Sequence, residues 1–413
     1  MNNFYKHKAI NGMECYLIKK EGFKKSYCGI GTKFGGNNLK YKIDDKIYNL
    51  KPGIAHFIEH KLFAQKDGTD AFNTFTKLNS SANAYTSNDK TVYYFTTNDD
   101  LKKPLALLLD MYYNPYFTNS NVESEKDIII SELNMNLDDI GYVYNEKILN
   151  ELYPNDDYSK MILGEESDIK SITKDDLYEA YNIFYSPLNT ILYVVADIEP
   201  DLLFSFIDSK LKNNSKNEFK AIKLSNVSSV KPNNEIYYFK DDRISQTELI
   251  INLRMDDVTN KDPISCELLL GVFEALLNVS SKLYKKLDKK GLLLNDVHFN
   301  VNTSAETSFI MLTFTTNEPL KIIKIMKHEL KHLSFKKLKE EFIEIYFRHL
   351  KAQAISDMDL IYSLGDKALS LALEDINYFD MNELLINLKP KDISKYIESI
   401  KNSKVLATIS TKN

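Results

Sequence analysis

The chain has 413 residues, of which 43% are hydrophobic and 27% charged, a composition typical of globular proteins with more than one core. Its formal net charge of -5 lacks the basic excess needed to bind a phosphate backbone, so we expect no nucleic-acid partner. The amino-terminal residues lack a signal-peptide core, no uncharged run could span a bilayer, and three scattered cysteines argue against disulfides, so we expect a cytoplasmic protein with no membrane contact.

Helix-like and strand-like segments alternate along the first half of the chain. An apolar helix that carries the sequence HFIEH precedes residues 81–97, whose alternating pattern predicts strands. Three helices and a closing strand follow, at residues 99–113, 122–135, 172–185 and 189–198. Thr173 and Asp176 have capping-box spacing at the start of the third of these helices, which supports that boundary.

A similar order of elements recurs after the polar segment 216–235, which lacks apolar periodicity and is predicted to be a linker. The predicted strands and helices of this second half are residues 247–255, 266–278, 280–287, 296–302, 308–316, 318–333, 336–355, 389–400 and 403–410. The recurrence predicts an α+β protein with two homologous domains, residues 1–215 and 236–413. Each domain is expected to be a mainly antiparallel sheet with helices packed on one face.

Two segments, HFIEH and HELKH, place histidines four positions apart, where both side chains of a helix can reach one ion. In HELKH, His328 and His332 fall among lysines and opposite an apolar stripe, and clustered ammonium groups would repel a dication. The additional ligand of an extended zinc motif is also missing, because Phe335 and Leu338 stand where Gly and His would be needed. We therefore expect HELKH to be an ordinary exposed helix face.

In HFIEH, His56, Glu59 and His60 lie together opposite the apolar stripe, without lysines around them. A pair of hydrogen-bonded core histidines would give the same pattern. A later helix, however, carries Glu125 and Glu132 seven positions apart, about 20° from alignment, on an apolar face. Two carboxylates there would be costly to bury unless a cation or strong donors compensate them, so the cluster favours a zinc site.

HxxEH followed by two glutamates seven apart resembles the inverzincin metallopeptidases of the pitrilysin or insulinase family, especially its short soluble branch that includes the mitochondrial processing peptidase subunits. The segments GIAHFIEHKLF, SSANAYTSNDKTVYYF and EKDIIISE extend the resemblance. It implies that His56, His60 and Glu132 bind Zn²⁺, that Glu59 activates water, and that Glu125 supports catalysis from a hydrogen bond near a ligand. The implied activity is a zinc-dependent endopeptidase that cleaves peptides or unstructured polypeptide segments.

The segment Asn83, Ala84, Tyr85 and Thr86 resembles the strand at the active-site edge of that family. There an extended substrate adds to the sheet through backbone hydrogen bonds. Taken alone, the same residues are also compatible with an ordinary hairpin strand. The resemblance therefore implies, for these four residues, a role in binding an extended peptide.

The second half departs from the family pattern. In the segment LYKKLDKKGLLLN, Asp288 and Leu294 stand where an Arg and a Tyr of the active site would be expected. The resemblance and the chain length imply a homodimer, or a heterodimer with a related chain that supplies the missing pair. The alternative is a weak or inactive peptide-binding scaffold subunit of such a heterodimer.

Overall fold

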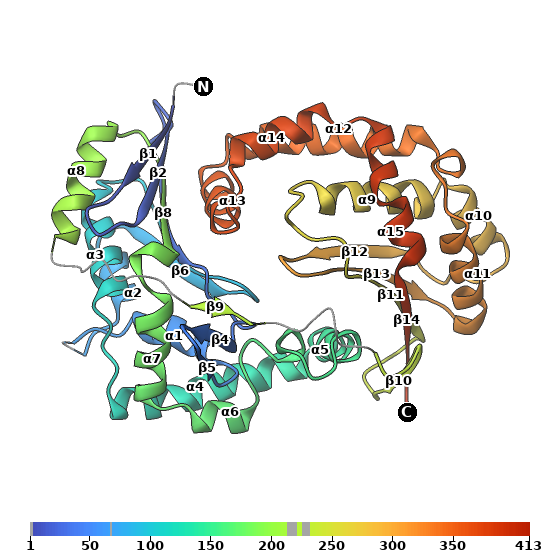
Figure 1. Cartoon of the computed structure of the whole chain (residues 1–413), viewed down its shortest axis with the longest axis horizontal. Helices are drawn as coiled ribbons and strands as arrows, with labels where there is room; N and C mark the ends of the chain where they lie inside the picture. The colour runs from blue at the N-terminus through green and yellow to red at the C-terminus, as the bar shows by residue number, and fades with distance from the viewer. Residues whose placement is uncertain (1–2, 67, 213–220, 225–231) are drawn as a thin grey trace. The chain divides into compact units, whose positions relative to one another are not determined.

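The computed structural model of the chain describes residues 3–66, 68–212, 221–224 and 232–413 (Figure 1). Most of the predicted linker, residues 216–220 and 225–231, lies outside the described residues. The chain divides into two compact units, each assembled from three separate segments. The first unit comprises Met1–Asp139, Lys160–Ser225 and Ser356–Tyr378, and the second comprises Ile140–Ser159, Asn226–Ile355 and Phe379–Asn413.

The first unit is built on a six-stranded sheet in the order β1-β2-β8-β3-β7-β6. β2 and β8 run parallel, and the other neighbouring strands run antiparallel. The strands are β1 Phe4–Lys8, β2 Glu14–Lys19, β3 Ser26–Thr32, β6 Ser80–Thr86, β7 Thr91–Thr97 and β8 Thr190–Ala196. A smaller sheet, in the order β5-β4-β9, joins β4 Lys40–Ile43 to β5 Lys46–Asn49 and β9 Ile222–Lys223.

Several helices cover one face of the large sheet and form the core of the first unit with it. They are α1 Ile54–Leu62, α2 Ala71–Lys77, α3 Lys102–Tyr113, α4 Asn119–Asp138, α6 Glu166–Ser171, α7 Lys174–Phe184 and α8 Pro200–Leu211, with the short turn η2 Pro187–Asn189 before β8. Strand residues such as Cys28 and Leu192 meet helix residues such as Phe57 and Leu105 in this core, and all four are fully buried. The apolar periodicity of the helices is therefore satisfied on one side of the sheet.

The opposite face of this sheet carries a helix from far along the chain, α13 Ile361–Leu373, which packs on β3 and β8. Two glycines of β3 make room for it: a Cβ at Gly29 would lie 2.8 Å from the Leu369 side chain, and one at Gly31 would lie 2.7 Å from Leu373. A side chain at either position would force the leucine that it meets to move from its place against the sheet. The sequence pattern predicted helices on one face of the sheet, so this helix on the second face differs from that prediction.

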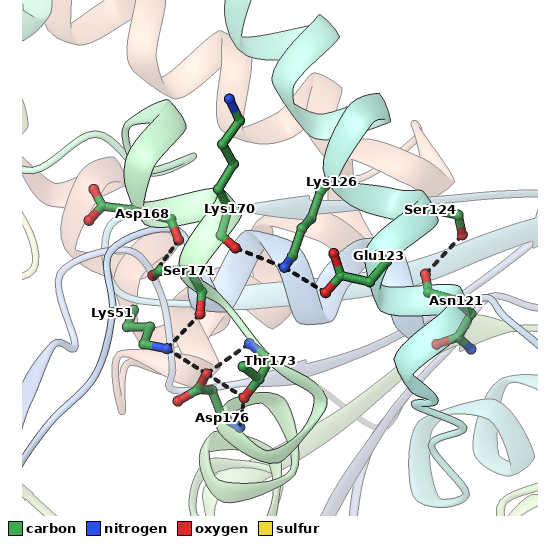
Figure 2. Close-up of polar contacts among 10 residues, drawn as sticks. All are labelled: Lys51, Asn121, Glu123, Ser124, Lys126, Asp168, Lys170, Ser171, Thr173 and Asp176. Atoms are coloured by element: carbon green, nitrogen blue, oxygen red, sulfur yellow. Dashed lines mark hydrogen bonds and ion pairs between the residues drawn. The ribbon is translucent and has the colours of Figure 1, made fainter.

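The C-terminal end of α6 is held by two lysines from other segments, which Figure 2 shows in close-up. Nζ of Lys126 on α4 donates to the carbonyl oxygen of Lys170 at 2.8 Å, and Nζ of Lys51, just before α1, donates to that of Ser171 at 2.7 Å. Lys51 also forms an ion pair of 2.7 Å with Asp176 on α7. Cations satisfy the orphan carbonyls of a helix C-terminus and complement its dipole, so this corner ties α1, α4, α6 and α7 together.

The second unit is built on a five-stranded sheet in the order β10-β14-β11-β13-β12. β10 and β14 run parallel, and the remaining pairs are antiparallel. The strands are β10 Ile236–Lys240, β11 Glu248–Met255, β12 His298–Thr303, β13 Ser308–Thr315 and β14 Lys404–Thr411. The helices and short turns that follow or precede them are α9 Ser265–Leu277, α10 Lys282–Lys289, α11 Pro319–Lys331, η3 Phe335–Lys337, α12 Glu340–Asp357, α14 Tyr378–Asn387, η4 Pro390–Tyr396 and α15 Ile397–Asn402.

The second unit also contains a helix from the first half of the sequence, α5 Ile140–Leu152, followed by the turn η1 Asp157–Ser159. Tyr144 and Ile148 of α5 join Ile250 and Phe309 of the sheet in one buried cluster. The guanidinium of Arg254, which is 1% exposed, donates a 2.6 Å hydrogen bond to the carbonyl oxygen of Leu152 at the end of α5. A buried charge is stable only with such strong acceptors, so α5 is an integral part of this sheet's cover.

The predicted fold class is confirmed: the chain is α+β, and its two large sheets are mostly antiparallel with packed helices. The helix start predicted at Thr173 is also present, because its side chain and that of Asp176 form a reciprocal capping box at the start of α7. No described helix combines the length and the apolar character required to cross a membrane.

Candidate metal centre

Helix α1 begins at a glycine whose conformation excludes other residues. Gly53 has a φ of 86°, in the left-handed region, and a Cβ there would lie 2.3 Å from the carbonyl oxygen of Leu163. A side chain would meet both backbone strain and a clash. The tight approach fixes the first turn of α1, which carries His56, against the loop before α6.

The two faces of α1 divide as the sequence pattern predicts. Its apolar residues lie in the core of the first unit: Ile54, Phe57, Ile58 and Leu62. His56, Glu59 and His60 lie together on the other side of the helix. His56 is buried at 7% exposure, and Glu59 and His60 are half-buried. This polar face meets α4, with which α1 is in contact.

Helix α4 supplies the carboxylates. Its start is fixed by a capping box in which Thr118 accepts from the backbone N–H of Asn121 and the Asn121 side chain accepts from that of Thr118. Ile129 and Leu133 are buried in the core, so the helix cannot rotate freely. Both Glu125 and Glu132 are directed toward α1, as their contacts with its histidines establish.

His56, His60 and Glu132 converge on one point. Nε2 of His56 lies 3.7 Å from Oε1 of Glu132, and Nε2 of His60 lies 3.3 Å from Oε2 of Glu132. One ligand atom from each residue lies within 4.8 Å of the others, and within the described residues no other three His, Cys, Asp or Glu side chains make such a group. The predicted ligand set is thus brought together in space.

The spacing of these atoms fits a zinc ion. Two ligand atoms, each about 2.1 Å from a tetrahedral zinc ion, are about 3.4 Å apart, close to the two separations between histidine nitrogens and the carboxylate. At 3.7 Å the His56 and Glu132 atoms are too far apart for a good hydrogen bond, so that bond does not account for their approach. Two imidazoles and one carboxylate are also the donor types that catalytic zinc prefers.

Behind this group, Glu125 joins His60 to a lysine whose position the sequence pattern did not indicate. Oε1 of Glu125 lies 3.1 Å from Nδ1 of His60, and its Oε2 accepts a 2.7 Å hydrogen bond from Nζ of Lys61. The side chain of Lys61 is only 6% exposed. The expectation that no lysine surrounds the histidines was therefore wrong, because the flexible stem of Lys61 reaches Glu125 instead of extending into solvent.

The electrostatics of the cluster follow from these contacts. Burial alone would raise the pKa of Glu125, but the hydrogen bonds from His60 and Lys61 bring this pKa below its ordinary value. The imidazole of His56, helped by His60, also holds the pKa of Glu132 below its ordinary value. For His60, burial would lower the pKa, but the contact with Glu125 and the nearby carboxylates raise it. Glu125 and Glu132 are thus held in their anionic form.

Glu59 lies on the same face of α1 and is held by the sheet. The hydroxyl of Thr86, the last residue of β6, donates a 2.6 Å hydrogen bond to Oε2 of Glu59. The other carboxylate oxygen is left available for a second partner. This links the predicted catalytic acid-base group directly to the predicted substrate strand.

The four residues Asn83 to Thr86 lie on β6, which is an edge strand of the six-stranded sheet and, within the described residues, pairs with β7 alone. Ala84 packs toward the core, whereas the Tyr85 hydroxyl donates to Asp366 of α13 at 3.2 Å, on the opposite face. The backbone N–H of Ala84 is hydrogen-bonded to the side chain of Asn83 at 2.8 Å. Apart from this local bond at Ala84, which a substrate strand would have to replace, the outer backbone edge of β6 has no strand partner among the described residues and lies next to Glu59.

The second histidine cluster has the exposed character that was expected. His328 of α11 and His332, which caps the C-terminus of this helix, are both exposed, whereas Ile322, Met326 and Leu330 on the other side of the helix are buried. The two positions that depart from the family pattern lie in the second unit. Asp288 is an exposed residue of α10, and Leu294 is 43% exposed after it.

Two family models match consecutive parts of the chain. The model "Insulinase (Peptidase family M16)" matches residues 48–166, which include the whole candidate site, and "Peptidase M16 inactive domain" matches residues 171–347. The fold, the ligand cluster and these matches define a two-domain protein of the insulinase type. The chain belongs to peptidase family M16, which confirms the resemblance seen in the sequence.

Individual relatives agree with this assignment. The chain is 28% identical over 406 residues to a protein of Bacillus subtilis (strain 168) described as an uncharacterized zinc protease, covering 95% of this chain and 93% of that protein. It is 33% identical over 135 residues to the beta subunit of the mitochondrial-processing peptidase of Saccharomyces cerevisiae, covering 30% and 28% of the two chains. Among solved structures, it is similar to a putative M16-like peptidase from Alicyclobacillus acidocaldarius, with a TM-score of 0.87, 20% identity and coverage of 99% and 98%.

Proposed function

We propose that the protein is a zinc-dependent endopeptidase that cleaves peptides or unstructured polypeptide segments. The observation that carries the proposal is the convergence of His56, His60 and Glu132 beside Glu59, in the segment that matches the peptidase model. In this proposal His56, His60 and Glu132 hold Zn²⁺, which when bound acts as a Lewis acid toward water and the scissile carbonyl. Relatives named as zinc proteases support the choice of metal.

The chain's own residues supply the proton transfers. Glu59, placed on the same helix face as the ligands, accepts a proton from the attacking water and passes it to the amine that leaves when the peptide bond breaks. The Thr86 hydroxyl holds one oxygen of this carboxylate at 2.6 Å, so the other oxygen can exchange the proton. Glu125 orients His60 through its contact with Nδ1, which leaves Nε2 directed at Glu132.

We propose that the substrate binds as an extended strand along β6. An edge strand offers backbone donors and acceptors, and residues Asn83 to Thr86 lead directly to Glu59 through the contact of Thr86. Because such pairing is made by the backbone, a folded substrate would first have to open. Peptides and unstructured segments therefore fit this edge better than compact proteins.

We further propose that a second chain completes the active enzyme, as a homodimer or as a heterodimer with a related chain. The motivation is the pair Asp288 and Leu294, which stands where the family pattern leads us to expect Arg and Tyr. A relative named as one subunit of a processing peptidase supports an assembly of this kind. Light scattering that finds a stable monomer with full cleavage activity would rule the partner out. The cytoplasmic location stays a prediction.

A peptide-binding scaffold without catalytic activity is the second candidate, and the same two substitutions favour it. The retention of all three proposed ligands together with Glu59 weighs against it. Buried carboxylates are costly without a cation, so a site that no longer bound metal would not be expected to keep them. Metal analysis separates the two candidates: the enzyme is expected to bind about one zinc ion per chain. A chain that binds none would favour the scaffold.

The decisive test of the enzyme is Glu59→Gln. This change keeps the shape and the hydrogen bond with Thr86 but removes the group that accepts the proton. We expect the purified variant to bind zinc as the wild type does and to cleave a mixed peptide library, read by mass spectrometry, at least about a hundredfold more slowly. The library is incubated with and without candidate partner chains, and undiminished cleavage by the variant would refute the assignment.

A further inference from the structure

Lys61 occupies an unusual place beside the candidate metal centre. It follows His60 in α1, yet its side chain is 6% exposed and its ammonium group donates to Oε2 of Glu125 at 2.7 Å. The other oxygen of the same carboxylate lies 3.1 Å from Nδ1 of His60. Glu125 is thus clamped between a lysine and a histidine, and its own side chain is 14% exposed.

We propose that Lys61 is a positioning residue for the metal centre, which acts by holding Glu125 as the hydrogen-bond acceptor of His60 Nδ1. This inference rests on the proposed role of His60 as a zinc ligand. When Nδ1 carries the proton and donates it to Glu125, the lone pair of Nε2 is free, and Nε2 is the atom that faces Glu132 at 3.3 Å. Lys61 thereby selects the tautomer that can bind metal without touching the metal itself.

The charges of the site support this role. With neutral imidazoles, the carboxylates of Glu59, Glu125 and Glu132 carry three negative charges in a half-buried space, and a dication offsets only two of them. The ammonium group of Lys61 supplies the third positive charge, so that the loaded site is neutral. An uncompensated charge at this depth is costly. Without Lys61, Glu125 would be expected to rotate away from His60, and its hold on Nδ1 would be lost.

A lysine that merely stabilises the fold would behave differently, and the same unit offers a matched control. Lys126 on α4 is also buried, at 8% exposure, and pairs with Glu123 at 2.8 Å and with the carbonyl oxygen of Lys170, as Figure 2 shows. Its ammonium group has no contact with His60 or Glu125 among these bonds. Lys126→Met therefore removes a buried lysine of the same kind without removing the support of Glu125.

The first experiment observes the tautomer of His60 directly in the metal-free protein, at an alkaline pH where the imidazole is neutral. Nitrogen-15 histidine spectra would be recorded for the wild type, Lys61→Met, Lys61→Arg and Lys126→Met, with the His60 signals assigned by their loss in His60→Asn. We expect His60 to be protonated at Nδ1 in the wild type, in Lys61→Arg and in Lys126→Met. In Lys61→Met we expect a mixture that includes the Nε2 tautomer.

The second experiment measures zinc affinity by titration with a competing chelator. Loss of a group that orients a metal ligand weakens metal binding by about 10- to 100-fold, and we expect a loss of this size for Lys61→Met. Lys61→Arg should restore most of the affinity, and Lys126→Met should keep it even if its melting temperature falls. If Lys61→Met does not fold, Lys61→Gln replaces it and is expected to lose affinity as well, because it keeps an N–H donor but not the charge.

The outcomes of this inference are separable from those of the proposed function. If Lys61→Met had the same His60 tautomer and the same zinc affinity as the wild type, the role of Lys61 would be overturned. This result would not depend on whether the wild type cleaves peptides. Equal losses in Lys61→Met and Lys126→Met, with no rescue by Lys61→Arg, would reduce Lys61 to a folding residue and also overturn it. A chain that binds zinc and shows the expected response at Lys61, but cleaves no peptide, would refute only the peptidase.

Discussion

The hydroxyl of Thr86 donates a 2.6 Å hydrogen bond to Oε2 of Glu59 and so joins the end of an edge strand to the polar face of helix α1. A single contact therefore couples the place where an extended peptide would lie to the group that would take up a proton. The bond fixes the carboxylate without occupying its second oxygen. The position of Glu59 is thus set by the sheet as well as by its own helix.

Thr86→Val is expected to lower kcat for peptide cleavage by about tenfold, equivalent to about 1.4 kcal/mol, because Glu59 would lose its charged hydrogen bond. Zinc content should not change, since Thr86 contacts no proposed ligand. Thr86→Ser keeps the hydroxyl and should recover most of the rate. Steady-state kinetics with a fluorogenic peptide would measure the effect, and a wild-type kcat in Thr86→Val would contradict this role.

Zinc is expected to stabilise the native chain. Removal of the metal with a chelator should lower the melting temperature, and added zinc should restore it, because a ligand that binds only the folded state stabilises it by mass action. Glu132→Ala should abolish this response to zinc. His332→Ala, in the exposed pair on α11, is the matched control and should respond as the wild type does. A zinc response that survives in Glu132→Ala would exclude the proposed ligand set.

Gly53→Ala is expected to cost about 3 kcal/mol of unfolding free energy or more, since it combines positive φ with a clash against Leu163. Gly22 has a similar φ of 79°, but no atom lies within 4 Å of the place that a Cβ would take. Gly22→Ala should therefore cost only about 1 kcal/mol, from backbone strain alone. Urea denaturation of both variants measures the difference, and equal losses would argue against the clash.

Stability should depend on pH through Glu146, a residue of α5 that is 8% exposed. Burial raises its pKa from 4.5 to about 6, so the folded state holds this proton more tightly than the unfolded state does. The buried carboxylate therefore costs stability above pH 6, and the cost disappears as the pH falls toward 4.5. Glu146→Gln should stabilise the chain by up to about 2 kcal/mol at pH 8 and by about half of that or less at pH 5. Thermal melts at the two pH values give the test, and a gain independent of pH would contradict it.

Helix geometry alone could assign each member of the candidate metal cluster to a helix face, whereas the roles of these residues as ligands were implied by the family resemblance. Residues four and seven apart return to one face of a helix, so His56 with His60, and Glu125 with Glu132, could each be assigned to a common side. The apolar neighbours then indicated which side faces the core. HELKH could be set aside for the same reason, since its lysines and histidines share the exposed face of α11.

Lys61 was missed because spacing describes where a side chain starts and not where it ends. A lysine has four rotatable bonds, and only the position of Glu125 on another helix makes the buried conformation favourable. The contact between Thr86 and Glu59 was likewise not predictable, because it joins a strand to a helix through their packing. Alternation along residues 81–97 indicated strands but not which one would form the edge of the sheet.

The helices α5 and α13 show a different limit of prediction from the sequence, which concerns the packing of helices on sheets. Each is apolar along one side, as any packed helix is, but periodicity carries no information about which sheet a helix will cover. Gly29 and Gly31 on β3 hold the complementary signal, since two glycines in a fully buried strand indicate that something approaches closely. The two glycines do not show which residues approach them, and only the structure identifies these residues as Leu369 and Leu373.

Helix α5 comes from the first half of the sequence but belongs to the second unit, and α13 comes from the second half but belongs to the first unit. This arrangement limits how the chain can be divided. If the chain were expressed as two fragments divided within residues 216–235, each fragment would lack one helix that packs on its sheet. Each would also carry one helix whose partner sheet is on the other fragment. We expect such fragments to be insoluble when made separately and to recover structure when they are made in the same cell. The two halves of the sequence therefore depend on each other for folding, even if only the first of them carries the chemistry.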